Sequence, residues 1–277
     1  MNEMPLRDVT EDEIKTYEED GIVCLREMFD ADWVERLRAA VEDCMGKPSH
    51  MVQELATAQK DKGRFFADIY VWTYNDDCRA YVFQSPAAKI AAAMMRSNQV
   101  CIFFDQWLVK EPGTPTRTPW HHDLPYWPVN GNQICTVWLA LDPVTAENGS
   151  VEYIKGSHRW GQRYRAQSFT GDTRYKEELP PVPDIDARRD EFSFAQFEMQ
   201  PGDCTVHHGL TVHGAPGNAT STTRRRALVS RWAGDDATYY PRPNIMPQLR
   251  EPDLPPGAPI ECDLWPRVWP PHAEAAE

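Results

Sequence analysis

The chain has 277 residues, enough for one large domain, and a formal net charge of -13, which disfavours a nucleic-acid partner because phosphate binding needs concentrated Lys and Arg. No apolar run approaches the ~20 residues of a membrane span, and the acidic start is unlike a signal peptide, so we expect a cytoplasmic protein with no membrane partner. The seven scattered cysteines never show a Cys-x-x-Cys spacing, which argues against a disulfide framework and a thiolate zinc site.

Residues 1–97 carry the signals of supporting helices. Thr10 and Glu13 have the form of a capping box, so a helix should begin there. Gly21 suits the end of this helix, and the apolar run 22–25 that follows predicts a short strand.

Two further helices are predicted in the same part of the chain. Trp33, Leu37 and Val41 recur at helical spacing, with charged residues between them. A helix over 87–96 is indicated by the Ser-Pro pair before it, which suits an N-cap and a first helical position.

From residue 98 the pattern changes to short apolar or alternating runs separated by Pro, Gly and Asn. This spacing predicts a β-sandwich or jelly roll over 98–240 rather than alternating βα units. The predicted strands cover residues 100–110, 133–142, 150–154, 197–199, 203–207 and 225–232.

Two segments do not fit this pattern. The polar, Pro-containing stretch 161–197 predicts a long loop of the kind that often covers a site. The Pro-rich residues 241–277 predict an extended tail, because proline disrupts helices and central strands. We interpret 1–277 as a single domain.

A His-x-Asp motif at His121 and Asp123 is the first candidate for a metal site. In an extended chain these two side chains would project to one face, while His122 would point away. Taken alone the motif is weak, because a surface or core histidine explains it at least as well.

A second group of histidines supplies the missing ligand. His213 lies between two turns and completes two histidines and one carboxylate, the facial triad suited to non-haem ferrous iron. His207 and His208 are rivals for this role, and the residues alone do not separate them.

The segment 224–232 reads as a strand shortly after His213. If Ala227 and Val229 face the interior, Arg225 does too, and its guanidinium could pair with a carboxylate. The alternative is a solvated basic rim.

Taken together, these segments resemble the phytanoyl-CoA dioxygenase family of Fe(II)/2-oxoglutarate oxygenases. The likeness covers most of the chain, and it rests on the order and spacing of motifs that are individually unspecific. The segments that carry it are 18–26, 109–113, 120–123, 137–142, 147–150, 155–158, 160–161, 213–218 and 225–228.

The resemblance implies a fold that is mainly β with flanking helices, a double-stranded β-helix of the jelly-roll, cupin-like type, with iron at its open mouth. It identifies His121, Asp123 and His213 as the metal ligands and catalytic centre. The cofactors implied are Fe(II), 2-oxoglutarate as cosubstrate, and O2.

The cosubstrate residues implied by the resemblance begin with Arg225, which would hold the distal carboxylate of 2-oxoglutarate. Arg224 is the alternative, because one extra residue after Asn218 makes the spacing ambiguous. Trp138 matches a residue that lines the cosubstrate, and Lys110 lies in a recurring motif.

The activity implied is hydroxylation, or another oxidation, of an unactivated C–H bond in a small organic molecule, with release of succinate and CO2. Related halogenases replace the metal carboxylate with a small residue, so the presence of Asp123 favours hydroxylation. Candidate substrate-pocket residues are Trp120, Tyr126, Trp127, His158 and Arg231.

Two other functions are compatible with the same motifs. A cupin-like metal isomerase or cosubstrate-independent dioxygenase would use the histidines but would have no use for an inward Arg225. A non-catalytic binding protein on the same barrel is disfavoured because all three candidate ligands are present.

Overall fold

The computed structural model describes residues 1–55, 63–169, 175, 177–243, 245 and 251–272. Four α-helices lie in the N-terminal third: α1 (Glu11–Asp20), α2 (Ala31–Gly46), α3 (Asp76–Gln84) and α4 (Ala87–Met95). Short 3-10 helices are η1 (Val71–Thr73), η2 (Leu124–Tyr126), η3 (Ser157–Arg159) and η4 (Asp186–Glu191).

Helix α1 shows how local sequence sets the N-terminal elements. The Thr10 side chain accepts a hydrogen bond from the Glu13 backbone, and the Glu13 side chain accepts one from the Thr10 backbone. Gly21 ends the helix at φ 75°, a left-handed conformation that glycine adopts readily, and its N–H donates to Tyr17 O at 2.8 Å. The predicted capping box and the strand at 22–25 are confirmed.

The strands form two principal sheets. The larger has eight strands, in the order β1-β10-β7-β12-β4-β3-β2 with β14 also paired to β4. Its strands are β1 (Ile22–Leu25), β2 (Gln53–Glu54), β3 (Phe65–Ile69), β4 (Val100–Lys110), β7 (Ile134–Ala140), β10 (Cys204–His208), β12 (Arg225–Ala233) and β14 (Arg267–Trp269).

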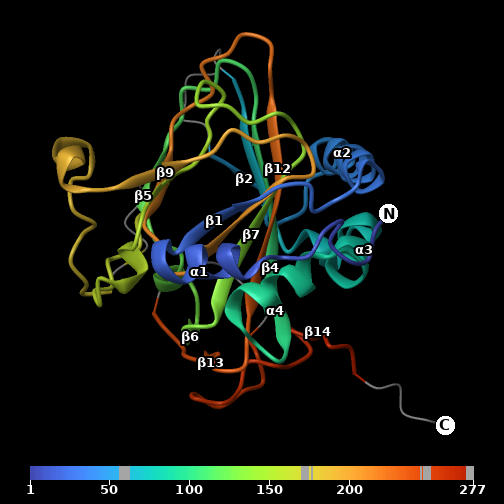
Figure 1. The fold of residues 1–277 in the computed structure, drawn as a ribbon, viewed down its shortest axis with the longest axis vertical. Coiled ribbons are helices and arrows are strands. Elements are labelled where there is room, and N and C mark those ends of the chain that lie inside the picture. Colours follow the sequence, from blue (N-terminus) through green and yellow to red (C-terminus); the bar gives the residue numbers. More distant parts are fainter. Residues whose placement is uncertain (56–62, 170–174, 176, 244, 246–250, 273–277) are drawn as a thin grey trace.

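The smaller sheet has four strands in the order β5-β11-β8-β9. They are β5 (Thr118–His121), β8 (Glu152–Ile154), β9 (Phe194–Gln196) and β11 (His213–Ala215). A separate pair joins β6 (Val129–Asn130) to β13 (Thr238–Tyr239). In Figure 1 the smaller sheet lies on the opposite side of the larger sheet from α2 and α3.

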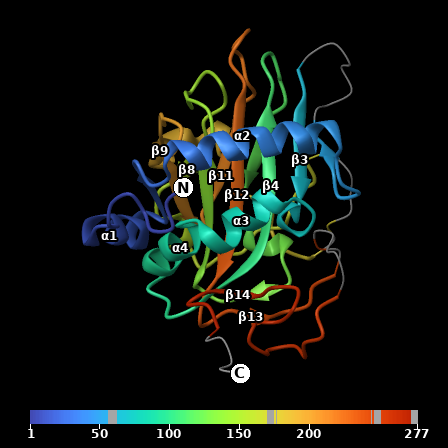
Figure 2. The same ribbon diagram turned by 90° about the vertical axis from the view of Figure 1, so that its right-hand side faces the viewer.

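Helices α2, α3 and α4 cover one face of the larger sheet, as Figure 2 shows. Their apolar sides bury a large core with that face of β4, β7, β10 and β12, which includes Trp33, Leu37, Tyr81, Ile90, Trp107 and Val137. The other face of the sheet is therefore left to line the barrel interior, where Trp138, Ala227 and Val229 pack together. The predicted jelly roll with flanking helices is confirmed.

One predicted strand needs correction, and two elements were not predicted. The strand predicted at 197–199 is wrong: β9 ends at Gln196, and Met199 forms only an isolated bridge with Val144. Strand β3 and helix α3 were not predicted, and β3 extends the larger sheet beside β4.

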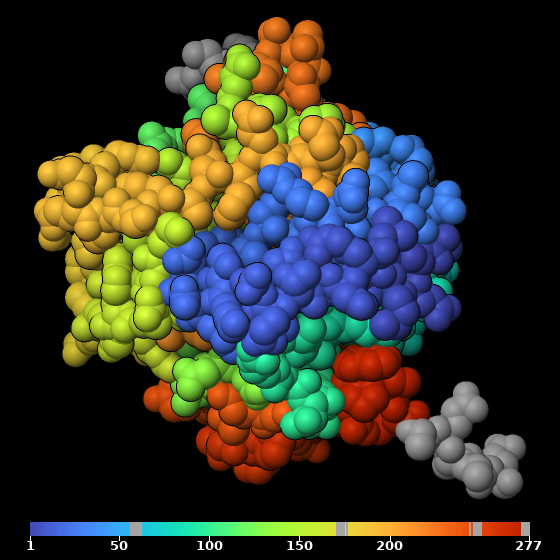
Figure 3. Space-filling view, viewed as in Figure 1, coloured from blue at the N-terminus to red at the C-terminus, as the bar shows by residue number. Residues whose placement is uncertain are grey.

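The predicted loop and tail both contain regular structure. The 161–197 segment includes η4 and β9, and the part around η4 projects from the molecule (Figures 1 and 3). In the tail, β14 pairs with β4, so this part of the Pro-rich segment adds an edge strand. Predicted loop and tail residues 170–174, 176, 244, 246–250 and 273–277 lie outside the described residues.

Among the helices of the described residues, none combines the length and the apolar character that a membrane crossing requires.

Candidate metal centre and active-site cavity

Two candidate ligands are placed by strand pairing. His121 ends β5 and His213 begins β11, and the antiparallel register sets them directly opposite each other. Their ring centroids are 4.2 Å apart. Cross-strand partners on one face lie close enough to share a ligand, so the smaller sheet itself brings these two imidazoles together.

Asp123 reaches the same point by a different route from the one predicted. The chain leaves β5 at His121, and Asp123 has helical angles (φ -73°, ψ -40°) at the start of η2. The extended geometry expected for the motif is therefore wrong at Asp123, because the chain turns before Pro125. His122 points away, as expected, and accepts a hydrogen bond from Tyr164 N at 2.9 Å.

The three side chains form a compact donor set. One ligand atom from each of His121, Asp123 and His213 lies within 4.8 Å of the others. Nδ1 of His121 contacts Pro119 O at 2.8 Å and Nδ1 of His213 contacts Thr211 O at 2.9 Å, which requires the proton on Nδ1. Each Nε2 is then unprotonated and lies on the side of Asp123, where its lone pair can bind a metal.

The two oxygens of Asp123 have separate surroundings. Oδ1 faces Nε2 of His121 at 3.6 Å and Nε2 of His213 at 3.9 Å. Oδ2 accepts from Thr136 Oγ1 at 3.0 Å and lies 3.3 Å from His207 Nε2. Because Oδ2 is held by the protein, Oδ1 is the oxygen available to a metal.

Electrostatics keep these groups in the ionisation states that bind cations. Burial acts to raise the pKa of Asp123, but its polar contacts with His121 and His207 and the charge of Arg231 bring it well below its usual range. Burial and the neighbouring histidines hold the pKa of His213 well below its usual range. An ionised carboxylate and a neutral imidazole are both competent ligands.

The two rival histidines occupy other positions. His207 lies behind Asp123, with its ring 4.6 Å from that of His213, and it is not part of the clustered donor set. His208 is on the opposite side of β10 and accepts a hydrogen bond from Leu210 N at 3.0 Å. Alternation along the strand separates the two neighbours.

A cavity of about 320 Å³ opens between the two sheets at this donor set. Both sheets, η2 and the loop residues 167–169 line it with mainly apolar and aromatic side chains. Its walls include Phe104, Tyr126, Trp138, Phe169, Arg225 and Arg231. A largely apolar pocket with a few convergent polar groups is typical of small-molecule sites.

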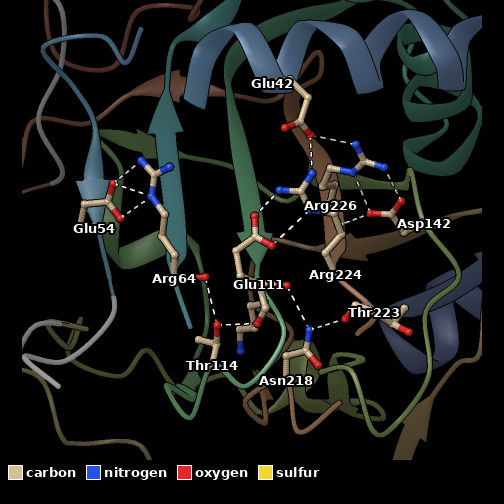
Figure 4. Close-up of polar contacts among 11 residues, drawn as sticks. Glu42, Glu54, Arg64, Glu111, Thr114, Asp142, Asn218, Thr223, Arg224 and Arg226 are labelled. Atoms are coloured by element: carbon tan, nitrogen blue, oxygen red, sulfur yellow. Dashed lines mark hydrogen bonds and ion pairs between the residues drawn. The ribbon is translucent and has the colours of Figure 1, made fainter. Parts of the chain in front are cut away.

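The structure separates Arg225 from Arg224. Arg225 is 2% exposed, lines the cavity and donates to Gly149 O at 3.0 Å. Arg224 points out of the barrel, where Figure 4 shows it paired with Glu42 and Glu111. Arg226 also lies outside, bound by Asp142. Because successive side chains alternate between the two faces of a strand, Arg225 faces inward while its neighbours Arg224 and Arg226 face outward.

Trp138 and Lys110 are both close to Arg225 but in different ways. Trp138 lines the cavity, with the Arg225 guanidinium 5.3 Å from its ring. Lys110 is buried, donates to Pro216 O at 2.5 Å and does not line the cavity. Burial and the charge of Arg225 hold the pKa of Lys110 well below its usual range.

The five candidate substrate residues divide between two locations. Tyr126, Trp127 and Arg231 line the cavity. Trp120 packs against Phe194 outside it, and His158, in η3, contacts Glu18 O of α1. The structure therefore brings the first three to the donor set and not the other two.

Sequence reasoning missed Thr136 and Tyr153. Thr136 is two residues before Trp138 on β7, so the predicted strand already placed both on one face. Tyr153 pairs with His213 across β8 and β11, and its ring stacks on the imidazole at 5.7 Å between centroids. No local signal marks it, because the strand pairing is tertiary.

We expect Thr136→Val to weaken divalent metal binding by about 10- to 100-fold, the usual cost of losing a partner that orients a ligand. Valine has nearly the same shape but cannot donate to Asp123 Oδ2. The affinity is measured by titrating Mn²⁺ and following the free ion by electron paramagnetic resonance. Equal affinities in Thr136→Val and the wild type would show that Thr136 does not orient the carboxylate.

Comparison with known proteins places these features in a family. The sequence model described as phytanoyl-CoA dioxygenase (PhyH) matches residues 17–227. A multifunctional dioxygenase, prhA, of Penicillium brasilianum is 33% identical over 134 residues, which are 46% of this chain and 39% of that protein. The peroxisomal phytanoyl-CoA dioxygenase of Rattus norvegicus is 23% identical over 81% of this chain and 68% of its own length.

Solved structures show the same architecture. The non-heme alpha ketoglutarate dependent carbocyclase SnoK from nogalamycin biosynthesis superposes with a TM-score of 0.75 at 25% identity, over 97% of this chain and 100% of its own. The epimerase SnoN, in complex with Fe³⁺, alpha ketoglutarate and nogalamycin RO, superposes with a TM-score of 0.73 at 23% identity, over 93% and 98%. With a family match that spans most of its length, the chain belongs to the phytanoyl-CoA dioxygenase family.

Proposed function

We propose that the protein is a non-haem Fe(II)/2-oxoglutarate-dependent dioxygenase that hydroxylates, or otherwise oxidises, a small organic molecule. The observation that carries this proposal is the presence of two separate features in one cavity: the clustered donors of His121, Asp123 and His213, and the buried guanidinium of Arg225. The first suits a divalent metal and the second a carboxylate, which together match an iron-bound keto acid with a distal carboxylate.

The donor set fits ferrous iron by its chemistry. Two neutral imidazole nitrogens and one carboxylate oxygen leave the remaining coordination positions open toward the cavity. Bound iron would supply the oxidising chemistry, in which 2-oxoglutarate, O2 and the substrate are converted to succinate, CO2 and the oxidised substrate. Asp123 occupies the position that is small in related halogenases, which supports hydroxylation over halogenation.

The protein's own residues would do the positioning. Arg225 would receive the distal carboxylate with its Nε, which has no hydrogen-bond partner among the described residues. Trp138 would form the wall beside it. Aromatic side chains around the metal site, among them Tyr126 and Phe169, would exclude water and hold the substrate against the centre.

The proposal is tested by turnover without a known substrate. The Fe(II)-loaded protein should convert 2-oxoglutarate to succinate slowly in air, and the His213→Ala protein should not. Succinate is measured by liquid chromatography and mass spectrometry, with metal-free protein as a control. Substrate turnover that needs no 2-oxoglutarate would favour a cosubstrate-independent dioxygenase or isomerase, and no iron-dependent chemistry with any substrate would favour a binding protein.

A further inference from the structure

A second arginine shares the cavity with Arg225. Strand β12 alternates, so Arg225, Ala227, Val229 and Arg231 all face the barrel interior. In the strand register, Arg231 lies opposite Thr136 of β7, and the Thr136 hydroxyl donates to Asp123. The Arg231 guanidinium is therefore on the metal side of the cavity. Arg225 lies further along the strand, beside Trp138.

Arg231 is buried and has no anionic partner among the described residues. Its side chain is 7% exposed and its Nε has no hydrogen-bond partner. Its one hydrogen bond to a described residue is a long contact of 3.4 Å from Nη1 to Val229 O. Asp123 and Asp105 attract it electrostatically, but neither forms an ion pair with it. Burial lowers the pKa of Arg231 only to about 10, so it remains charged at neutral pH.

An unpaired buried charge is costly and calls for a ligand. The other inward arginine of β12, Arg225, also has no anionic partner among the described residues, and in the proposed function the distal carboxylate of 2-oxoglutarate would pair with it. In the loaded cavity, the divalent metal and the two guanidiniums carry more positive charge than the Asp123 carboxylate and dianionic 2-oxoglutarate carry negative charge. The net charge of these groups is one positive charge. A substrate with a single negative charge would neutralise it.

The surroundings of Arg231 indicate the rest of that substrate. Its guanidinium lies 4.4 Å from the ring of Phe104, and Trp127 packs on the same ring at 5.6 Å. Tyr126 contacts Phe169 and Tyr175 on the same side of the metal site. Flat apolar surfaces around one buried cation suit an amphipathic organic anion.

We propose that Arg231 binds a carboxylate of the substrate, and that the substrate is a monoanionic molecule with a hydrophobic body held by the surrounding aromatic side chains. This inference rests on the proposed function, because it needs 2-oxoglutarate to occupy the Arg225 end. It assigns the two inward guanidiniums to two different carboxylates.

The test uses pairs of small probes that differ only in charge. Protein loaded with Mn²⁺ and saturated with 2-oxoglutarate is mixed with 3-phenylpropanoate or its primary amide, and with 2-naphthoate or its amide. Paramagnetic relaxation of the probe protons reports binding near the metal. The wild type should bind the carboxylates and largely ignore the amides. Arg231→Met should weaken carboxylate binding by at least about 30-fold, the lower end for loss of one partner of a buried charge pair.

Three controls separate the possible outcomes. Arg231→Lys should retain part of the carboxylate affinity, and Arg224→Met, which alters the outward arginine immediately before β12, should leave it unchanged. Arg231→Met should keep its affinity for Mn²⁺ and 2-oxoglutarate and unfold at the same or a higher temperature, because it removes an unpaired buried charge. A purely structural arginine would lower that temperature.

The inference fails if no probe pair shows carboxylate selectivity, or if Arg231→Met leaves that selectivity intact. It also fails if Arg231→Met loses 2-oxoglutarate affinity, because Arg231 would then hold the cosubstrate. Failure of the proposed function has a different signature: the wild-type protein with metal bound would show no affinity for 2-oxoglutarate at all.

Discussion

His213→Ala should abolish tight metal binding. Asp123 and His121 would remain, but two ligands from one short segment hold a divalent ion poorly, and the opposite strand would contribute nothing. We expect the Mn²⁺ affinity to fall by more than about 100-fold, beyond the range seen when an orienting partner is lost. The wild type should gain about 2.7 kcal/mol of stability when the metal is at 100 times its Kd, and the variant should gain none.

His122→Gln is the matched control for this experiment. His122 is adjacent to the metal motif, but its Nε2 accepts from Tyr164 N, and glutamine retains an acceptor. Metal affinity and the metal-dependent shift in unfolding temperature should stay close to the wild-type values. A variant of His213 that still binds Mn²⁺ tightly would mean that His207, with its ring beside those of the cluster, supplies the third ligand instead.

Arg225→Met should leave metal binding intact and weaken 2-oxoglutarate binding by about 30-fold or more, because one partner of a buried charge pair is worth roughly 2–5 kcal/mol. Methionine fills a similar space beside Trp138 but carries no charge. The cosubstrate affinity is measured by calorimetric titration of the Mn²⁺-loaded protein with 2-oxoglutarate.

Arg224→Met tests the alternative assignment directly. Arg224 is paired with Glu42 and Glu111 outside the barrel, so its loss should change only surface interactions and leave cosubstrate affinity unaltered. The opposite result, with Arg224→Met impaired and Arg225→Met normal, would reverse the assignment.

Much of the fold was predictable because local chemistry and burial agreed. The Thr10 capping box, the Gly21 stop and the apolar face of α2 are each set within a few residues, and all are present. Strands with long apolar runs, such as β4 and β12, were also found. Strand β3 was missed because its pairing with β4 is long-range.

The candidate site was likewise predictable only where local sequence determines it. The three donors could be nominated from residue type and spacing. The residues alone left His213 and His207 as rivals, the family resemblance chose His213, and the register of β5 and β11 sets His213 opposite His121. Asp123 was nominated for a geometry that it does not have, since it lies in a turn. Thr136, Tyr153 and the unpaired state of Arg231 depend on contacts between distant strands, which no spacing reveals.

The most direct test of the central claim is optical. Adding 2-oxoglutarate to the anaerobic, Fe(II)-loaded protein should produce the visible metal-to-ligand charge-transfer band of an iron-bound keto acid. The band should be absent in His213→Ala and should need a much higher 2-oxoglutarate concentration in Arg225→Met. If the wild-type protein holds iron and no band appears at any 2-oxoglutarate concentration, the cosubstrate does not chelate the metal, and the dioxygenase proposal is wrong.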